Sequence, residues 1–340
     1  MLNVAAIGLG WVTTNRHIPS LRRHPGVRLV GVIDRSEERA RLLAAKLGVA
    51  WATTLDAPWM SAVQALTIGT PPDSHHPIAL AALSRGLHVL TEKPFAMNPD
   101  QGKEMLAAAV DAKRILAVVH NFQFARSVAQ ARRRFEQGQA GELKSVLGLQ
   151  FSSHARRLPS WYKQLPGGLF YDEAPHLFYL LRSFLPDFAI TQTSMVKSLD
   201  PADNTPRLVS TVHGQGRTVG SIQMFFDAAI SEWQLVLMGS RETLVADIFR
   251  DILVRLPPDH RHEGRDVLRT SAFAMGTHLL GTLTSGVRHA SKTLDYGNSE
   301  VVRRFVAAVE SGIEPEGISG RDGLAVIEAM ARVLAPETRP

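Results

Sequence analysis

The alternation of short apolar runs with amphipathic stretches over the first 120 residues constrains the fold most. Apolar runs at 4–8, 28–34, 66–69, 88–91 and 115–120 are separated by helix-like stretches at 15–23, 36–47, 77–85 and 99–113. Strands that alternate with helices in this way form a parallel sheet with right-handed crossovers. The alternation therefore predicts an α/β domain with a doubly wound parallel sheet over residues 1–122.

The pattern changes after residue 122, and no flexible linker marks the change. Helix-like stretches at 127–137 and 173–184 flank a strand-like run at 143–154, and shorter alternating runs follow at 191–198, 208–213, 218–226, 233–238 and 243–248. Three helical stretches, at 266–290, 297–311 and 321–334, end the chain. Consecutive strands joined by short turns predict an α+β domain with an open, mostly antiparallel sheet over residues 123–340.

Composition excludes several classes of site. The 340 residues include no cysteine, which rules out disulfides, iron–sulfur clusters, cysteine-rich zinc sites and cysteine nucleophiles. The net charge of +6 fits a solvated basic surface, an anionic ligand or nucleic acid. No nucleic-acid recognition motif occurs, and Arg132, Arg133 and Arg134 fit a solvated helix face. No apolar run approaches the ~20 residues of a membrane span and no targeting segment is visible, so we expect a soluble cytoplasmic protein.

The segment 8–13 (GLGWVT) follows the first apolar run and matches the first two glycines of G-x-G-x-x-G. In dinucleotide-binding Rossmann folds, Gly8 would allow the tight turn and Gly10 would let the backbone approach a pyrophosphate. Thr13 stands where a third glycine or alanine is usual. Asp34 lies 21 residues beyond Thr13, at the end of the second apolar run, where a carboxylate binds the ribose diol. An ordinary glycine turn and a helix-start aspartate are the alternatives.

The same carboxylate indicates which dinucleotide is used. A 2′-phosphate beside Asp34 would meet like charge, which favours NAD over NADP. Arg35 and Arg39 lie close enough in sequence to leave NADP possible.

Beyond the Rossmann start, the sequence resembles a known family. Residues 66–96 (LTIGTPPDSHHPIALAALSRGLHVLTEKPFA) are similar to the segment from the third strand to the EKP turn in the glucose–fructose oxidoreductase and inositol dehydrogenase family, Gfo/Idh/MocA. The matching pieces, in chain order, are Thr70-Pro71-Pro72, His75, His88-Val89, Glu92-Lys93-Pro94, Gly167-Gly168 with Asp172 and His176, and Asp322-Gly323. The resemblance covers nearly the whole chain.

The resemblance implies a fold, an activity and a site. Members of the Gfo/Idh/MocA family oxidise or reduce hydroxyl and keto groups of sugars, cyclitols and sugar derivatives with NAD(P). The sheet of their second domain commonly forms dimers. The resemblance implies a homodimer or homotetramer, a reacting group of Lys93, Asp172 and His176, and a cis bond before Pro94. The cofactor-binding residues expected are Gly8, Gly10, Trp11, Val12, Thr13, Asp34, Arg35, Thr70, Pro71, His75, Glu92, Lys93 and Asn121. The substrate-binding residues expected are Lys93, Trp161, Tyr162, Tyr171, Asp172, His176 and Tyr179.

The residue types suit the chemistry that the resemblance implies. Hydride transfer at a carbinol carbon needs a proton partner on its oxygen, and lysine or histidine can serve. Asp172 and His176 share one helix face, and Pro175 predicts that this helix starts near Asp172. A surface position for Lys93, a helix cap for Asp172 and packing for His176 are the alternatives.

The aromatic residues suit the C–H faces of a sugar, with interdomain packing as the alternative. His154, Arg156 and Arg157 could bind an anionic substrate group or form a solvated loop. We expect no metal, because the adjacent His75 and His76 rarely reach one ion together.

Four positions depart from the family pattern. His17 lies one residue further from Gly8 than expected, Thr13 replaces a small residue, Gln123 stands where an arginine often follows Asn121, and Tyr179 replaces a second aspartate. The helical stretch 266–290 is also longer than usual. Three other functions stay open: a keto-sugar reductase, perhaps of nucleotide sugars; an NAD-dependent glycosidase; and a non-catalytic, cofactor-binding regulator.

Overall fold

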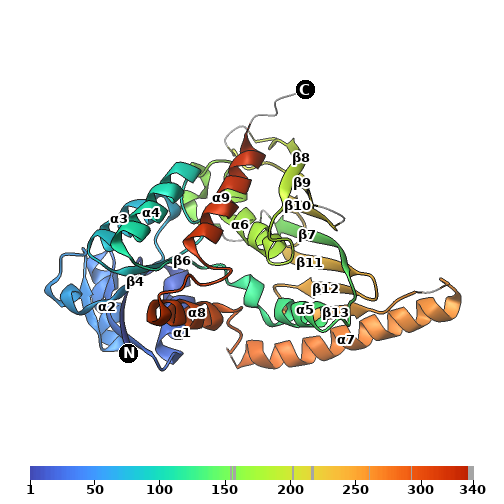
Figure 1. Ribbon diagram of the computed structural model, residues 1–340, viewed down its shortest axis with the longest axis horizontal. Helices are drawn as coiled ribbons and strands as arrows, with labels where there is room; N and C mark the ends of the chain where they lie inside the picture. Colours follow the sequence, from blue (N-terminus) through green and yellow to red (C-terminus); the bar gives the residue numbers. More distant parts are fainter. Residues whose placement is uncertain are drawn as a thin grey trace. The chain divides into compact units, whose positions relative to one another are not determined.

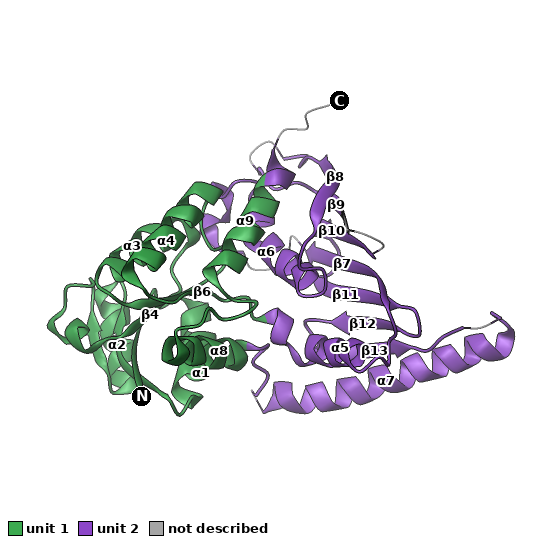
Figure 2. Cartoon of the chain, viewed as in Figure 1, with its two compact units in different colours: residues 1–121, 298–331 green, residues 122–297, 332–340 purple. Residues whose placement is uncertain are grey.

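The computed structural model describes residues 1–153, 155, 158–200, 203–215, 218–259, 261–291 and 293–335. The chain divides into two compact units (Figure 2). The first consists of residues 1–121 and 298–331, and the second of residues 122–297 together with the described residues from 332 onward.

The first unit has the parallel sheet that the alternation predicts. Its strands are β1 (Leu2–Ile7), β2 (Val27–Ile33), β3 (Ala50–Ala52), β4 (Ala65–Ile68), β5 (His88–Thr91) and β6 (Leu116–Val118). They lie in the order β3-β2-β1-β4-β5-β6, and all their pairings are parallel. Strands β4 and β6 of this sheet are labelled in Figure 1. The helices between them are α1 (Ile18–Arg23), α2 (Glu37–Leu47), α3 (His75–Ser84) and α4 (Pro99–Ala112), with short 3₁₀ turns at Pro58–Ala62 and Pro72–Ser74. This order of strands confirms the doubly wound domain, although the three-residue strand β3 was not predicted.

The first crossover explains two departures from the family pattern. Thr13–His17 forms a π-helical turn before α1, and a π turn holds about one residue more than an α turn, which accommodates the displaced His17. The Thr13 side chain is fully buried, and a Cβ added at Gly69 would lie 2.0 Å from its hydroxyl oxygen. Gly69 therefore provides the space that a larger residue at position 13 needs.

Two C-terminal helices, α8 (Asn298–Ser311) and α9 (Gly320–Leu334), bring the chain back to the first unit. A Cβ added at Gly26 would lie 3.7 Å from Val306, and one added at Gly102 would lie 3.0 Å from Leu324. The expected boundary near residue 122 assigned this whole segment to the second domain. The structure differs because the apolar faces of these helices pack beside the N-terminal segments.

The second unit is built on seven strands. These are β7 (Leu143–Ser153), β8 (Ala189–Val196), β9 (Leu208–Gln215), β10 (Thr218–Ala228), β11 (Glu232–Gly239), β12 (Thr243–Asp247) and β13 (Ile252–Leu256). Their order is β13-β12-β11-β7-β10-β9-β8, in which only the described pair β7–β10 is parallel. The helices are α5 (Arg126–Glu136), α6 (Leu169–Arg182) and α7 (Gly264–Ala290), with 3₁₀ turns at Phe122–Phe124 and Ser160–Gln164. The open, mostly antiparallel sheet is thus confirmed, and β13 is an addition to it.

Helix α6 starts earlier than the sequence predicts. It begins at Leu169, whose N–H donates to the Thr205 hydroxyl over 3.0 Å, and Gly168 before it has a φ of 56°. Thr205 comes from a distant part of the chain, so the local sequence could not reveal it. Asp172 therefore lies within the first turn, and its interpretation as the cap of this helix is wrong. Pro175 lies inside the helix, where it provides no N–H for the preceding turn.

Candidate active site

The loop after β1 depends on two glycines for different reasons. Gly8 has a φ of 83°, and a Cβ there would lie 2.5 Å from the Thr70 side chain, so only glycine fits. A Cβ added at Gly10 would meet no other atom within 4 Å. The backbone at Gly10 is therefore open to an approaching group, while Trp11 and Val12 beside it are exposed.

Asp34, at the carboxyl end of β2, is buried and holds this loop in place. One carboxylate oxygen accepts the Leu9 N–H over 2.8 Å, and the other accepts the Ser36 N–H over 2.9 Å. The exposed guanidinium of Arg39 lies 3.2 Å from both oxygens. Ser36 is the cap of α2, since its hydroxyl accepts the Arg39 N–H, so Asp34 is not the capping residue. Arg35 is exposed.

The loop after β4 faces the Gly8 turn and is held by His75. The buried His75 ring has one nitrogen 2.9 Å from the Thr70 carbonyl oxygen and the other 2.8 Å from the Pro94 carbonyl oxygen. Burial lowers the pKa of His75, although both carbonyls act in the opposite direction. His75 thereby joins the loops that follow β4 and β5. Pro71 in the same loop is exposed.

The segment after β5 contains the predicted lysine. Glu92 is buried, with one oxygen 2.7 Å from His17 Nε2 and the other accepting the Lys93 N–H over 2.9 Å. Burial raises the pKa of Glu92, but the hydrogen bond and charge of His17, followed by Lys93, outweigh it and leave the pKa below its ordinary value. The Lys93–Pro94 bond is cis, as the resemblance implies. Lys93 itself is half-buried, not a fully exposed surface lysine.

Phe95 anchors the other end of this turn. It is 1% exposed, and a Cβ added at Gly323 in α9 would lie 2.7 Å from its ring. Ser319 and Asp322 form reciprocal hydrogen bonds at the start of α9. The Asp322-Gly323 piece of the family pattern therefore supports the Lys93 turn.

A dinucleotide fits the residues of the first unit. Gly10 leaves room for close approach of a pyrophosphate to the backbone, and the loop precedes a helical turn whose N–H groups attract phosphate. Among the described residues, the buried hydroxyl of Thr70 has no hydrogen-bond partner. Asp34 stands where the ribose diol is expected, with its oxygens already engaged by two N–H groups and Arg39. Asn121, buried near the end of β6, belongs to this unit.

In the second unit, His176 on α6 is 8% exposed and lies in a hydrogen-bonded series. Its Nδ1 is 2.7 Å from the hydroxyl oxygen of Tyr179, one turn further along α6. That oxygen also accepts the Phe122 N–H over 3.1 Å. The structure therefore brings together His176 and Tyr179, two of the predicted residues. The backbone N–H of Phe122 holds the Tyr179 hydroxyl in place.

Aromatic rings surround His176. The ring of Phe122 is 4.7 Å from that of His176, and the ring of Trp233 on β11 is 4.8 Å away. Tyr296 packs edge-on against Phe122 and donates its hydroxyl hydrogen to the Phe249 carbonyl. These neighbours were not predicted from the sequence. Phe122 adjoins Asn121 and could have been suspected, but Trp233 lies 57 residues from His176 and gave no local signal.

A second buried carboxylate on α6 was also missed. Glu173 accepts hydrogen bonds from Ser152 over 2.8 Å and from the side-chain amide of Gln150. Gln150 and Ser152 point inward from β7 and are fully buried. This polar cluster fixes α6 on the sheet and sets the position of the helix that carries Asp172 and His176.

The remaining predicted residues are distributed around α6. Asp172 is half-buried in its first turn, and Tyr171 is buried, which raises the pKa of the phenol. Tyr162 is buried in the 3₁₀ turn Ser160–Gln164, where burial, and then Asp203 and Asp200, raise its pKa. Trp161 in the same turn is half-buried, and Gln123 is buried. His154, Arg156 and Arg157 lie outside the described residues.

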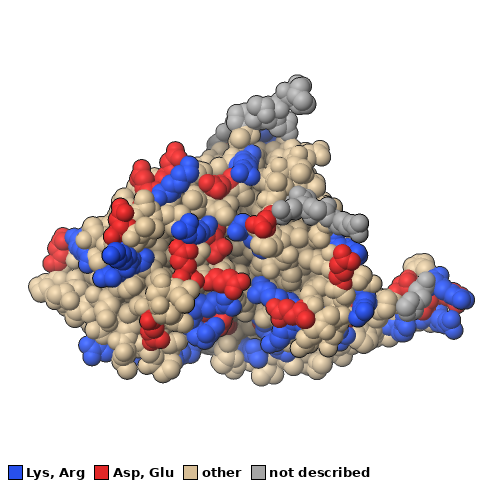
Figure 3. Space-filling view, viewed as in Figure 1, with Lys and Arg blue, Asp and Glu red and all other residues tan. Residues whose placement is uncertain are grey.

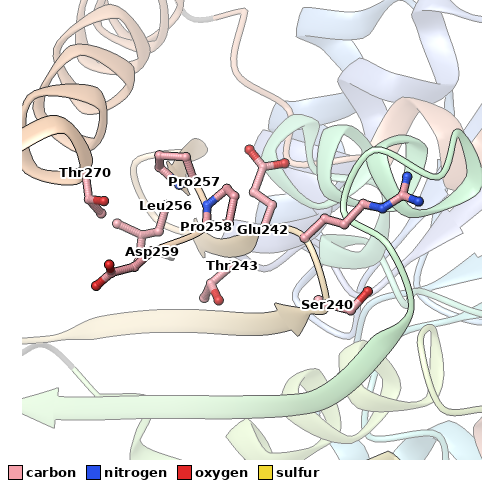
Figure 4. A pocket seen from close by; sticks show the side chains of 10 residues that line it. Ser240, Glu242, Thr243, Leu256, Pro257, Pro258, Asp259 and Thr270 are labelled. Atoms are coloured by element: carbon pink, nitrogen blue, oxygen red, sulfur yellow. The ribbon is translucent and has the colours of Figure 1, made fainter. Parts of the chain in front are cut away.

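One hollow in the second unit contains none of the predicted site residues. It measures about 400 Å³ and lies between the β11–β12 turn, the segment after β13 and α7 (Figure 4). Glu242 in its wall is paired with Arg134 and Arg255, each at 2.6 Å. The described residues include no group of three or more His, Asp or Glu side chains arranged to hold a metal ion. None of the described helices has the length and hydropathy of a membrane-spanning segment.

Residues 2–120 match the Gfo/Idh/MocA family model, described as an oxidoreductase family with an NAD-binding Rossmann fold. Over these residues the chain is similar to this family. Among curated relatives, the uncharacterized oxidoreductase YdgJ of Escherichia coli is 32% identical over 189 residues, 52% of this chain and 51% of the relative. The D-glucoside 3-dehydrogenase of Escherichia coli is 32% identical over 178 residues, 49% of each chain. These matches thus span about half the length of the relatives.

A solved structure extends the similarity of fold to nearly the whole chain. GenD2 from gentamicin A biosynthesis, in complex with NAD, aligns with a TM-score of 0.76 at 22% identity, covering 98% of this chain and 94% of GenD2. The chain therefore shares the fold of that structure, with a sheet in each of its two units.

Proposed function

We propose that this protein is an NAD(P)-dependent oxidoreductase that transfers a hydride between nicotinamide and a sugar, cyclitol or sugar-derived alcohol or ketone. The observation that carries the proposal is the arrangement in the first unit. The Gly8 turn, Thr70 and the Glu92–Lys93 turn follow β1, β4 and β5, which are neighbours in the sheet. Ligands of open α/β sheets bind at the carboxyl ends of such strands. NAD is the cofactor we favour, with NADP as the alternative.

Lys93 is the residue to which we assign the substrate proton. When bound, the dinucleotide supplies the nicotinamide carbon that accepts or gives the hydride. The Lys93 amine would take the hydroxyl proton in oxidation and return it in reduction. Glu92 and His75 hold its backbone, through the Lys93 N–H and the Pro94 carbonyl. We assign these two buried residues to positioning of the turn.

We also assign His176 and Asp172, both on α6, to the reacting group. The Tyr179 oxygen accepts the Phe122 N–H through one lone pair, and we propose the tautomer of His176 in which the Tyr179 hydroxyl donates its hydrogen to Nδ1. In the neutral ring, the proton then resides on Nε2, which can donate to a substrate oxygen but not receive its proton. His176 is therefore assigned to binding and orienting the substrate oxygen, and Tyr179 to positioning His176.

The substrate class follows from the aromatic residues and the relatives. Trp161 keeps part of its ring exposed, and flat rings suit the C–H faces of a sugar. We assign Trp161, Tyr162 and Tyr171 to the substrate side. The D-glucoside 3-dehydrogenase of Escherichia coli, whose name gives a sugar substrate, supports this class.

We further propose that residues 1–122, with α8 and α9 packed on them, bind the dinucleotide, while the rest of residues 123–340 provides substrate binding and assembly, in a cytoplasmic homodimer or homotetramer. The side chains of Leu147, Leu149 and Phe151 alternate with the buried ones of β7 and stay half-exposed. Phe225 on β10 lies 5.6 Å from Phe151, ring to ring. This partly apolar sheet face supports contact with a second subunit.

The test is a substrate panel read by nicotinamide absorbance. Sugars, cyclitols and sugar glycosides are offered with NAD or NADP, and keto-sugars, including nucleotide-linked ones, with the reduced cofactors. Reduced cofactor released with a sugar or cyclitol supports the proposal, and consumption with keto-sugars alone identifies a reductase. Glycoside cleavage with no net change in cofactor would identify the glycosidase cycle, and dinucleotide binding without turnover a regulator.

A further inference from the structure

Helix α7 exposes its apolar side chains and buries its polar ones. Its 27 residues span about 40 Å at 1.5 Å per residue. Large exposed hydrophobic residues recur along it: Val267, Leu268, Phe273, Met275, Leu279, Leu280, Leu283 and Val287, six of them at least 59% exposed. Leu268, Met275, Leu279 and Leu283 are spaced by seven, four and four residues, so they form one continuous stripe. We call this stripe, with the flanking Leu280 and Val287, the α7 face.

The opposite side of α7 meets the rest of the second unit with small and polar groups. Asp266 and Ser285 are the residues of α7 that are fully buried. A Cβ added at Gly281 would lie 2.5 Å from Ile252 of β13, and the Thr277 hydroxyl accepts the Arg255 N–H over 3.3 Å. A surface helix of a monomer normally has the reverse arrangement. The α7 face therefore needs a cover from outside the chain.

We propose that the α7 face binds the same face of a second copy of this chain, with the two helices antiparallel. This inference is independent of the proposed activity. With typical side-chain areas, the exposed hydrophobic residues of α7 present on the order of 800 Å², about what one partner buries in a stable protein interface. A single patch that covers itself is the usual arrangement of a two-fold dimer.

The sequence of the face is complementary to itself in this orientation. With the two-fold axis between positions 277 and 278, Leu268 faces Val287 of the partner, and Met275 faces Leu280. The same register sets Leu279 opposite Gly276, where an added Cβ would meet no atom within 4 Å. A large side chain thus enters the space above a glycine on both sides of the axis.

Charges agree with this register. Arg265 and Arg269 near the start of α7 are exposed, and in the antiparallel pair they face Ala290 and Gly286 of the partner. No like charges oppose each other at these positions. Charged side chains gather at the end of α7 that extends beyond the sheet (Figure 3), where they form a polar boundary to the face. In parallel helices, Arg265 and Arg269 would instead lie beside their own copies.

The first test is the mass of the protein in solution, measured by sedimentation equilibrium. Leu279→Glu places a charge at the centre of the face and should halve the mass of the wild-type assembly. His278→Glu is the matched control, since His278 is exposed on the same helix but points away from the face. The control should keep the wild-type mass. A monomeric wild type, or a Leu279→Glu variant with unchanged mass, overturns the proposal.

The second test uses the absence of cysteine from the chain. Leu279→Cys should give dimers with a short bismaleimide, because the two copies of position 279 flank the axis. Val287→Cys should not, because its copies would be about 28 Å apart along antiparallel helices. Leu42→Cys, exposed on α2, controls for random collision. Linkage at 279 alone supports the proposal even if Leu279→Glu fails to fold, whereas no linkage at 279, or linkage at 287, overturns it.

Discussion

At the scale of single residues, Lys93 lies in a turn whose backbone is firmly held. The Lys93 N–H binds Glu92, the Pro94 carbonyl faces His75, and Phe95 packs beside Gly323. None of these contacts uses the lysine amine. Replacing the amine leaves these three contacts in place.

Lys93→Met should consequently lower turnover by about 10²–10⁴, the usual contribution of a positioned acid–base group. Dinucleotide affinity should stay near the wild-type value, because Gly8, Gly10 and Asp34 do not depend on the amine. Steady-state rates and a cofactor titration measure the two effects separately. Near-normal turnover of the variant would show that a group other than Lys93 handles the substrate proton. Loss of cofactor affinity would show that Lys93 is a structural residue of the pocket.

Asp34 combines a structural and a selective role. Its carboxylate accepts the Leu9 N–H and also restrains Arg39. Asp34→Ser should weaken NAD binding by about tenfold, roughly the 1.5 kcal/mol of a lost charged hydrogen bond. It should also improve NADP binding, since Arg39 becomes available to a 2′-phosphate. Fluorescence titration of both cofactors measures the change, and a wild type that binds NADP more tightly contradicts the assignment of NAD.

Tyr179 permits a test that separates positioning from packing. Tyr179→Phe keeps the buried ring but removes the hydroxyl beside His176 Nδ1, so the proton of the neutral ring should no longer be confined to Nε2. We expect ¹⁵N NMR to show a mixture of His176 tautomers, a changed pH–rate profile and a turnover about tenfold lower. The matched control is Tyr296→Phe, which removes a hydroxyl that donates to the Phe249 carbonyl. Unchanged His176 signals in Tyr179→Phe would show that Tyr179 only packs.

The sequence predicted local conformation well where nearby residues determine it. The conformation of Gly8 and the capping of α2 by Ser36 depend on nearby residues, so a short motif was sufficient. Gly69, which leaves space for the Thr13 side chain, lies 56 positions from Thr13 in the sequence. Trp233, which packs beside His176, lies 57 positions from it. Such pairings depend on how strands are ordered in space, which one sequence does not reveal.

At the scale of secondary structure elements, the predictions missed strands that are short and a helix start that is fixed by a residue distant in sequence. β3 and β13 have three and five residues, too few for a clear periodic signal. The start of α6 was misplaced because Thr205, not a local cap, binds its first N–H. Apart from α6, the elements of eleven or more residues, such as α5 and β7, were placed within one or two residues because their periodic pattern is long enough to read.

His88 at the start of β5 should make the first unit sensitive to acid. Burial, followed by Arg114, lowers its pKa to about 4, and its Nδ1 accepts the Ile115 N–H over 3.0 Å. Because the folded pKa lies below the unfolded value of 6.5, the stabilisation is complete above pH 6.5 and is lost as the pH falls toward 4. The loss should be about 1–3 kcal/mol after allowance for partial exposure.

The comparison that tests this is His88→Asn, whose amide oxygen can still accept the Ile115 N–H but does not titrate. Urea unfolding at several pH values between 7 and 4 should show a steeper loss of stability for the wild type. Parallel pH dependences of the two proteins would show that His88 is not the group responsible.

At the scale of the whole molecule, the chain forms its first unit from two segments, and this determines what can fold alone. Val301, Val302, Phe305 and Val306 of α8 are at most 3% exposed. Burial of four such side chains contributes roughly 6–12 kcal/mol, at about 1.5–3 kcal/mol each. The whole stability of a typical domain is only about 5–15 kcal/mol. Residues 1–122 without α8 and α9 would therefore lose most of what holds them folded.

We accordingly expect the fragment 1–122 to be unfolded or aggregated, although it contains the entire parallel sheet. Joining it through a flexible Gly/Ser linker to residues 298–335 should restore a cooperative thermal transition and dinucleotide binding, since α8 returns to α1 and Gly323 to Phe95. Circular dichroism melting and a cofactor titration compare the two proteins. As a control, Phe305→Asp in the joined protein should abolish the transition again, because it places a charge at a buried position. A fragment 1–122 that melts cooperatively and binds the dinucleotide would show that α8 and α9 are accessory to this unit.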